Sequence, residues 1–284
     1  MFRYVAKATP KIPMNYSLLQ VPRSASELRC AIAARHRDRS RDRGHDAVAR
    51  VLENCELIVD PRDLAVAHHL LTVGFWEWWI TKAIADCMRP GTTCVDLGAN
   101  AGYFSALFCS LGAAAVIAVE PHPELVRRLR LTAARNGWPQ LDVVPCAVAD
   151  RAGKARLFVH GDDNLGGSAL VPPDDPRPQG IDVPVRTLDE ILGDRAPIQV
   201  LKIDCEGSEP AIWRGMQRVL ANNPDMHIFA EISVNSATEP WLRDVAAAGY
   251  PLRVVADGGD LVPLQLARIH EKELWMGYFH KDSP

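Results

Sequence analysis

Acidic residues lie at or directly after the ends of several hydrophobic segments of this 284-residue chain. Asp96 falls within TCVDL, Glu120 follows AVIAV, and Asp204 follows LKI. If these segments are strands of one parallel sheet, their carboxyl ends meet at the edge where such sheets bind ligands. Because buried carboxylates are costly without a compensating positive charge, we expect a cationic ligand at this edge.

The segment VDLGANAGYF predicts a strand, a glycine turn and the start of a helix. Gly98 and Gly102 would let bare backbone approach a ligand. Glu120, which lies 18 residues beyond Gly102, could accept hydrogen bonds from two ribose hydroxyls. A pyrophosphate is poorly served, because a dinucleotide fingerprint would need glycines where Asn100 and Tyr103 stand. We therefore expect S-adenosylmethionine, which carries an ammonium and a sulfonium group.

The candidate reaction centre contains several carboxylates. We assign Asp204 to positioning of cofactor or substrate, and Glu206 to substrate orientation or general-base work. His122, His227 and Glu231 are further candidates for the base, and Glu231 is favoured because its strand should end at the ligand-binding edge. Asp204, Glu206 and Glu231 could instead hold a divalent metal. No metal is expected, because a cofactor's positive charge accounts for the same acidic cluster.

Alternating segments indicate the elements that must position these groups. Strands are predicted at 93–97, 115–119, 141–148, 198–203, 227–232, 252–255 and 274–280, and helices at 101–111, 121–136, 209–220 and 239–248. Repeated strand-helix units predict an α/β fold with a largely parallel sheet covered by helices on both faces.

The domain organisation is predicted from charge and pattern. Residues 1–50 hold eleven basic and four acidic residues, which predicts a basic, solvated and flexible extension. Residues 51–90 are predicted to form a helical cover, so that helices precede the catalytic domain at 91–284. Short alternating segments around 154–187 predict a β-rich insertion in that domain.

The composition restricts the class of protein. The chain has 48% hydrophobic residues and a net charge of −3, which favours a globular protein without a general attraction to nucleic acid or membrane. Its seven cysteines form no C-x-x-C pair, and its first residues lack the apolar core of a secretory signal. Residues 97–119 are uncharged but interrupted by glycines, so no transmembrane segment is predicted. We expect a cytoplasmic protein.

Five segments in order resemble the FkbM-type methyltransferases. They are VDLGANAGYFS at 95–105, VEPHP at 119–123, CAVAD at 146–150, VPVRTLDEIL at 183–192 and LKIDCEGSE at 201–209. The resemblance covers about residues 60–235. It implies a class I methyltransferase (Rossmann-like) fold with a seven-stranded sheet and a reversed final strand. It also implies S-adenosylmethionine as the cofactor and, usually, a hydroxyl as the methyl acceptor.

The resemblance also implies roles for individual residues of this chain. The loop around the methionine and ribose portions would consist of Asp96, Gly98, Asn100 and Gly102, with Glu120 on the ribose. The adenine would lie against Cys146, Ala147 and Val148, and Glu77 would face the methionine end of the cofactor.

The predicted function is O-methylation of a hydroxyl on a sugar, glycolipid or natural-product acceptor. Amino methylation of nucleic acid is disfavoured, because DCEG stands where such enzymes carry a [DNS]-P-P-[YF] segment. The expected partner is thus a small-molecule or glycan acceptor. An NAD(P)-dependent oxidoreductase and a non-catalytic S-adenosylmethionine-binding protein are the alternatives.

Overall fold

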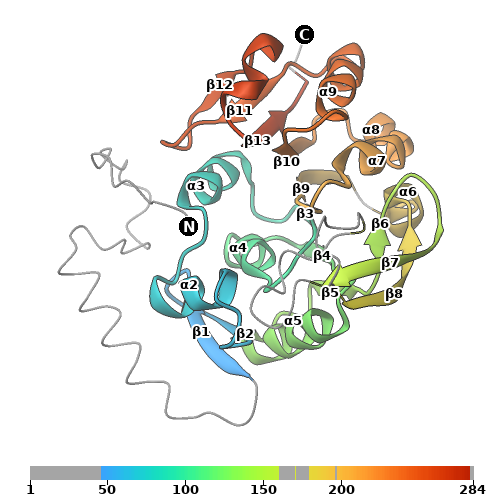
Figure 1. Cartoon of the computed structure of the whole chain (residues 1–284). Coiled ribbons are helices and arrows are strands. Elements are labelled where there is room, and N and C mark those ends of the chain that lie inside the picture. Colours follow the sequence, from blue (N-terminus) through green and yellow to red (C-terminus); the bar gives the residue numbers. More distant parts are fainter. Residues whose placement is uncertain (1–45, 160–169, 171–178, 196, 282–284) are drawn as a thin grey trace.

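The structure is a computed structural model that describes residues 46–159, 170, 179–195 and 197–281 (Figure 1). Most of the predicted N-terminal extension and the middle of the predicted insertion lie outside these residues. Within the described part, a large mixed sheet occupies the centre and helices flank it (Figure 1).

The central sheet has the strand order β12-β11-β13-β10-β9-β3-β4-β5. The strands are β3 (Thr93–Leu97), β4 (Ala115–Val119), β5 (Leu141–Val144), β9 (Ile198–Ile203), β10 (His227–Ser233), β11 (Arg253–Val255), β12 (Leu261–Pro263) and β13 (Leu274–Phe279). Strands β5, β4, β3, β9 and β10 pair in parallel, and β13 lies antiparallel between β10 and β11. The mostly parallel sheet with a reversed final strand is therefore confirmed.

The predicted strand count of seven is wrong by one. The short strand β12 pairs antiparallel with β11 and extends the sheet to eight strands. Its segment LVP contains Pro263, whose ring nitrogen cannot donate a hydrogen bond, and proline is tolerated at a sheet edge for this reason. The additional strand lies at the end of the sheet opposite to β5, so it leaves the order of the five parallel strands unchanged.

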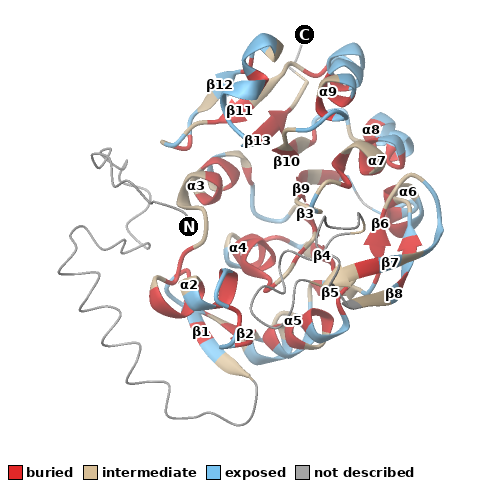
Figure 2. Ribbon diagram, viewed as in Figure 1, coloured by how far each residue is buried: buried red, intermediate tan, exposed pale blue. Residues whose placement is uncertain are grey.

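Both faces of the sheet are covered, because side chains of a strand alternate between two hydrophobic cores. In β3, Cys94 belongs to one core and Val95 to the other. One core includes residues of α2 (Val66–Thr72), α3 (Trp78–Cys87) and α4 (Tyr103–Ser110). The other includes residues of α6 (Leu188–Leu192), α7 (Glu209–Arg214), α8 (Gln217–Asn222), α9 (Thr238–Ala247) and the short η4 (Leu266–Glu271). Figure 2 shows buried residues along the central strands and exposed ones on the outer sides of the helices.

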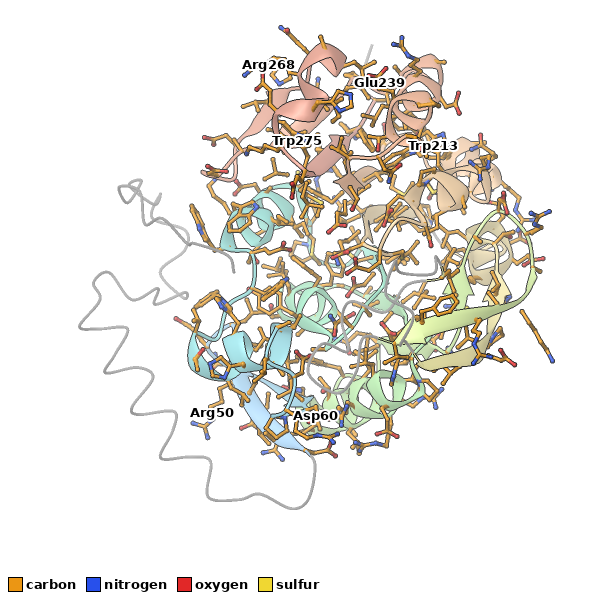
Figure 3. All side chains as sticks on the ribbon, viewed as in Figure 1. Arg50, Asp60, Trp213, Glu239, Arg268 and Trp275 are labelled. Carbon is orange, nitrogen blue, oxygen red and sulfur yellow. The ribbon has the colours of Figure 1, made fainter. Side chains whose placement is uncertain are left out.

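The part of the chain ahead of β3 begins with an antiparallel hairpin, β1 (Ala47–Val51) and β2 (Cys55–Val59), where an extension and a helical cover were expected. An ionic network joins this hairpin to α5 (Pro123–Asn136). Buried Arg128 donates to Asp46 and to Asp60, over 2.9 Å in each case. Asp60, which directly follows β2, is labelled in Figure 3. These pairs tie the segment before α2 and α3 to the Rossmann-like core.

The predicted strand 141–148 is divided between two sheets. After β5, the chain turns at Pro145, and the amide of Cys146 donates to the carbonyl of Val144 over 3.1 Å. Residues Ala147–Val148 form β6, which joins β7 (Gly153–Val159) and β8 (Gln179–Arg186) in a separate three-stranded sheet. Pro145 lacks an amide hydrogen and cannot continue a ladder, which explains the break.

The predicted helix 209–220 is also divided, into α7 and α8. A Cβ atom at Gly215 would overlap the carbonyl oxygen of Ala149 and come within 3.1 Å of the carbonyl carbon. The close approach of the two backbones requires glycine, and the helix ends there. No helix among the described residues is long and apolar enough to cross a membrane.

Candidate functional site

The loop after β3 is held against the ends of β4 and β9. The amide of Gly98 donates to the carbonyl of Val119 over 3.0 Å, and that of Asp204 donates to Leu97 over 3.1 Å. Gly98 has φ +71°, and a Cβ there would overlap the carbonyl oxygen of Asp204. Only glycine permits this approach, so three strand ends converge at one point.

Two further loop residues adopt left-handed backbone conformations. Gly102 (φ +86°) precedes α4, and a Cβ there would lie 2.5 Å from the Leu129 side chain of α5. Asn100 has φ +49°, a conformation that asparagine tolerates better than most residues. The backbone amide of Asn100 donates to Oε2 of Glu120 over 2.8 Å. The loop therefore binds the carboxylate that follows β4.

Glu120 is buried and oriented by backbone donors. Its Oε1 atom accepts from the amide of His122 over 2.8 Å, in addition to the bond from Asn100. Burial raises the pKa of Glu120 to about 7, although the two amide hydrogen bonds act in the opposite direction. A carboxylate has about four lone-pair sites, so Glu120 can still accept hydrogen bonds from a ligand.

A buried amine lies beneath the loop. Lys202 Nζ contacts Oδ2 of Asp204 over 2.9 Å and lies 4.8 Å from the centre of the Phe104 ring. Burial opposes the ammonium charge, but the neighbouring carboxylates, above all Asp204 and Asp96, raise the pKa of Lys202. Asp96 accepts from Ser105 Oγ over 2.6 Å, whereas its Oδ1 atom is buried without a partner among the described residues.

Two glutamates of the site, Glu77 and Glu206, have positive φ angles of 41° and 50°. Non-glycine residues pay a steric cost in this region, and such strain is concentrated at functional sites. Burial, assisted by repulsion from Asp204, raises the pKa of each glutamate to about 7. In the described part of the structure, Glu77 Oε2 is buried and accepts no hydrogen bond.

Glu231 lies near the carboxyl end of β10. Its Oε1 atom accepts from Ser233 Oγ over 2.9 Å. Burial and the charges of Asp204 and Glu206 raise the pKa of Glu231 well above its ordinary value, and the Ser233 hydroxyl partly offsets this rise.

Glu209, which the sequence reasoning missed, supports the turn that carries Glu206. It is 2% exposed, and its Oε1 atom accepts from the amide of Cys205 over 2.7 Å. Burial raises the pKa of Glu209 to about 7. The available signal was an acidic residue before Pro210 at the start of a helix.

These groups surround a cavity of about 360 Å³ at the carboxyl ends of the parallel strands. Its lining includes ten of the predicted site residues, namely Glu77, Gly98, Asn100, Glu120, Cys146, Ala147, Val148, Asp204, Glu206 and Glu231. Asp96 and Gly102 are not part of the lining. Asp96 accepts a hydrogen bond from Ser105 of α4. Gly102, at the start of α4, packs against Leu129 of α5.

The two histidine candidates lie outside the lining. His122 caps α5, where its Nδ1 atom accepts from the amide of Glu124 over 3.2 Å. His227 begins β10, at the end opposite to Glu231, and its Nδ1 atom lies 2.8 Å from the Tyr278 hydroxyl. Across the described ranges, no three His, Cys, Asp or Glu side chains are grouped so that they could hold a metal ion.

Solved structures with a similar course of the chain include several methyltransferases. The methyltransferase FkbM from Methylobacillus flagellatus KT is 16% identical with a TM-score of 0.48, and the match covers 75% of this chain and 52% of that one. An rRNA methylase from Streptococcus thermophilus is 10% identical, with coverages of 72% and 94% and a TM-score of 0.45. A precorrin-6y C5,15-methyltransferase from Geobacter metallireducens GS-15 is 11% identical, with coverages of 79% and 97% and a TM-score of 0.44. The chain thus spans about half the length of the first of these proteins.

A search of curated proteins gave no match. The family model described as "Methyltransferase FkbM domain" matches residues 96–252. This range includes the loop after β3 and three carboxylates at strand ends. They are Glu120 after β4, Asp204 after β9 and Glu231 near the end of β10. Because the match covers more than half of the chain, the protein belongs to the FkbM methyltransferase family.

Proposed function

We propose that this methyltransferase uses S-adenosylmethionine to methylate a hydroxyl group of a sugar, glycolipid or natural-product acceptor. The observation that carries the proposal is the excess of buried carboxylates around the cavity. Lys202 is the buried cation among them, while Asp96 Oδ1 and Glu77 Oε2 have no partner in the described residues. A cationic cofactor would supply the missing positive charge.

The arrangement fits the parts of this cofactor. Glu120 would hold the ribose hydroxyls, because its amide bonds fix its orientation and leave acceptor sites available. Glu77 and Asp204 would hold the ammonium group, and Cys146 and Ala147 would lie against the adenine. When bound, S-adenosylmethionine supplies a methyl group made electrophilic by the sulfonium charge.

Glu231 and Glu206 would then act on the acceptor. One of these carboxylates would accept the proton of the acceptor hydroxyl, while the hydroxyl oxygen would replace sulfur as the atom bonded to the methyl carbon. Once ionised, a carboxylate with a raised pKa is the stronger base, and Ser233 orients Glu231 and favours its ionised form. Asp204, fixed by Lys202, would position the reactants.

Isothermal titration with S-adenosylmethionine and S-adenosylhomocysteine tests the cofactor assignment. We expect both compounds to bind. We expect Glu120→Ala to weaken their binding by about 1.5–3 kcal/mol, which is the contribution of a hydrogen bond to a charged group. The control is Glu124→Ala, an exposed residue of α5. Unchanged binding in Glu120→Ala would reject the ribose assignment, and enhanced NADH fluorescence would instead favour the oxidoreductase.

Intact-mass detection of a methylated product across an acceptor library tests the reaction. With the product in hand, Glu231→Gln should lower kcat by about 10²–10⁴-fold, as for a lost general base. Its affinity for S-adenosylhomocysteine should stay within about threefold of wild type, less than 1 kcal/mol. Cofactor binding without turnover of any acceptor would favour the non-catalytic alternative.

The same proposal places the reaction in the cytoplasm. The six cysteines of the described residues are free, as expected in a reducing compartment. They are Cys55, Cys87, Cys94, Cys109, Cys146 and Cys205.

A further inference from the structure

We propose that the acceptor presents hydroxyl or ammonium groups to Glu206 and Glu231 and contacts Leu274 with an apolar part. It carries no phosphate or carboxylate beside the methylated hydroxyl. This inference rests on the proposed function and specifies the chemical class of its acceptor.

The first observation is the charge of the cavity wall. Five carboxylates line the cavity, those of Glu77, Glu120, Asp204, Glu206 and Glu231, and no Lys or Arg is among the described lining residues. The nearest buried cation, Lys202, is not part of the wall. Its charge is already engaged by Asp204 and by the Phe104 ring. An anionic ligand would therefore meet acidic groups without a compensating cation in this part of the chain.

The second observation concerns the carboxylates that remain for the acceptor. Glu120 is bonded by two backbone amides and Asp204 by Lys202. Among the described residues, Glu231 has one hydrogen-bond partner, Ser233, and Glu206 has neither a hydrogen bond nor an ion pair. In the ionised state that a general base requires, this pair only accepts hydrogen bonds, so a ligand that satisfies it must bring donors.

Glu77, which we assign to the ammonium group of the cofactor, has an Oε2 atom with no partner among the described residues, so the cofactor part of the cavity also needs a donor. This atom is buried, and Glu77 lines the same cavity as Glu206 and Glu231. A buried oxygen without a partner is unfavourable, and a hydrogen-bond donor or a positive charge on a ligand would satisfy it.

The third observation is an apolar side chain beside the acidic pair. Leu274 lines the cavity and remains 50% exposed. It lies directly opposite Ser233 in the antiparallel β10–β13 pairing. Glu231 and Ser233 are two residues apart in β10, so Glu231, Ser233 and Leu274 share one face of the sheet. An acceptor bonded to Glu231 would therefore contact Leu274 as well.

Matched octyl compounds, which differ only in their polar group, test this recognition. The protein is loaded with S-adenosylhomocysteine, and ligand-observed NMR measures the binding of octyl glucoside, octylammonium, nonanoate (octyl carboxylate) and octyl phosphate. We expect the glucoside and the ammonium to compete with each other. We expect both to bind at least about tenfold more tightly than the two anions, which corresponds to about 1.4 kcal/mol, because the anions meet like charges in the cavity wall.

Substitutions assign the selectivity to the carboxylate pair. In E206Q/E231Q, the preference over the anions should fall to within about threefold, which is less than 1 kcal/mol. The control E53Q/E271Q removes the same charge at two exposed positions outside the lining and should retain the preference. In Leu274→Ser, all four octyl compounds should weaken together.

Three outcomes would overturn the inference. They are anions that bind as tightly as their neutral and cationic counterparts, a preference that E206Q/E231Q leaves intact, and the absence of binding by any octyl compound to the loaded protein. Failure of S-adenosylhomocysteine itself to bind would instead reject the proposed function.

Discussion

Gly98 and Asp204 meet backbone to backbone at the centre of the site. A Cβ atom at Gly98 would overlap the carbonyl oxygen of Asp204 and lie 2.9 Å from its carbonyl carbon. The two residues belong to loops that follow neighbouring parallel strands, β3 and β9. Their contact fixes how far the glycine loop lies from the carboxylates of Asp204 and Glu206, and thereby the width of the cavity.

Gly98→Ala should therefore destabilise the protein more than strain in the backbone alone can explain. A left-handed conformation costs an alanine about 1–2 kcal/mol, and forced overpacking adds about 1–3 kcal/mol. Gly137→Ala is the matched control, because Gly137 has φ +65° with open space around its Cβ position. Urea denaturation of both variants measures the difference. Equal losses of unfolding free energy would contradict the contact.

Glu120 should make the stability of the ligand-free protein depend on pH. Burial raises its pKa to about 7, so the folded state binds this proton more tightly than the unfolded chain does. Its favourable contribution is complete below the unfolded pKa and is lost as the pH rises through 7. The pKa values of Glu77, Glu206 and Glu209 are raised to about 7 as well and act in the same direction.

We expect the free energy of unfolding to fall between about pH 5 and pH 7.5, and Glu120→Gln to reduce this slope. Urea denaturation at several pH values measures it, with Glu124→Gln as the exposed control. A Glu120→Gln slope equal to that of wild type would show that this carboxyl group does not titrate as described.

A cationic cofactor should bind more tightly as these carboxyl groups ionise. S-adenosylmethionine carries the sulfonium charge, whereas S-adenosylhomocysteine has a neutral sulfur and is otherwise similar. The ratio of their affinities should rise between about pH 5.5 and pH 8, by about tenfold for each 1.4 kcal/mol of added attraction. Calorimetric titrations of both compounds give the ratio. A ratio that does not change with pH would show that these carboxyl groups do not contribute to recognition of the sulfonium.

The positions of Glu120 and Asp204 were predictable because a parallel sheet brings the ends of its strands to one edge. Hydrophobic segments such as AVIAV mark those ends in the sequence. Each of the two residues lies in the cavity wall as a consequence of topology alone. The mostly parallel sheet with its reversed final strand agrees with the family resemblance, apart from the added β12.

Features that depend on contacts between distant segments were not predictable in this way. Glu209 lies close in sequence to Glu206, but its bond to the amide of Cys205 depends on a turn that no residue pattern specifies. The hairpin β1–β2 has an alternating pattern, yet its stabilising ion pairs come from Arg127 and Arg128, about 80 residues later. Pro145 marks the break after Val144 in the sequence, but no residue pattern shows that β6 joins a second sheet.

Lys202 should be essential for the stability of the site at neutral pH. Lys202→Met leaves Asp204 and Asp96 without their buried cation, and the loss of one partner of a buried ion pair costs about 3–5 kcal/mol. The loss should shrink at low pH, where Asp96, whose pKa is raised by burial, binds a proton. Lys272→Met is the control, since Lys272 also lies 4.8 Å from an aromatic ring, that of Trp275, but is exposed. Urea denaturation of both variants at neutral and low pH measures these losses, and similar values would contradict the role of burial.

Ser233 should hold down the pKa of Glu231 through its 2.9 Å hydrogen bond. In Ser233→Ala, the carboxylate loses a donor that favours its charged form, so the pKa of Glu231 should rise, by up to about one pH unit for a bond worth about 0.5–1.5 kcal/mol. NMR titration of ¹³C-labelled glutamate carboxyl groups measures this pKa, and Glu231→Gln identifies the resonance. Ser110→Ala, which removes a hydroxyl on α4, should leave it unchanged. A Glu231 titration that Ser233→Ala does not move, or moves to lower pH, would exclude Ser233 as the residue that orients the proposed base.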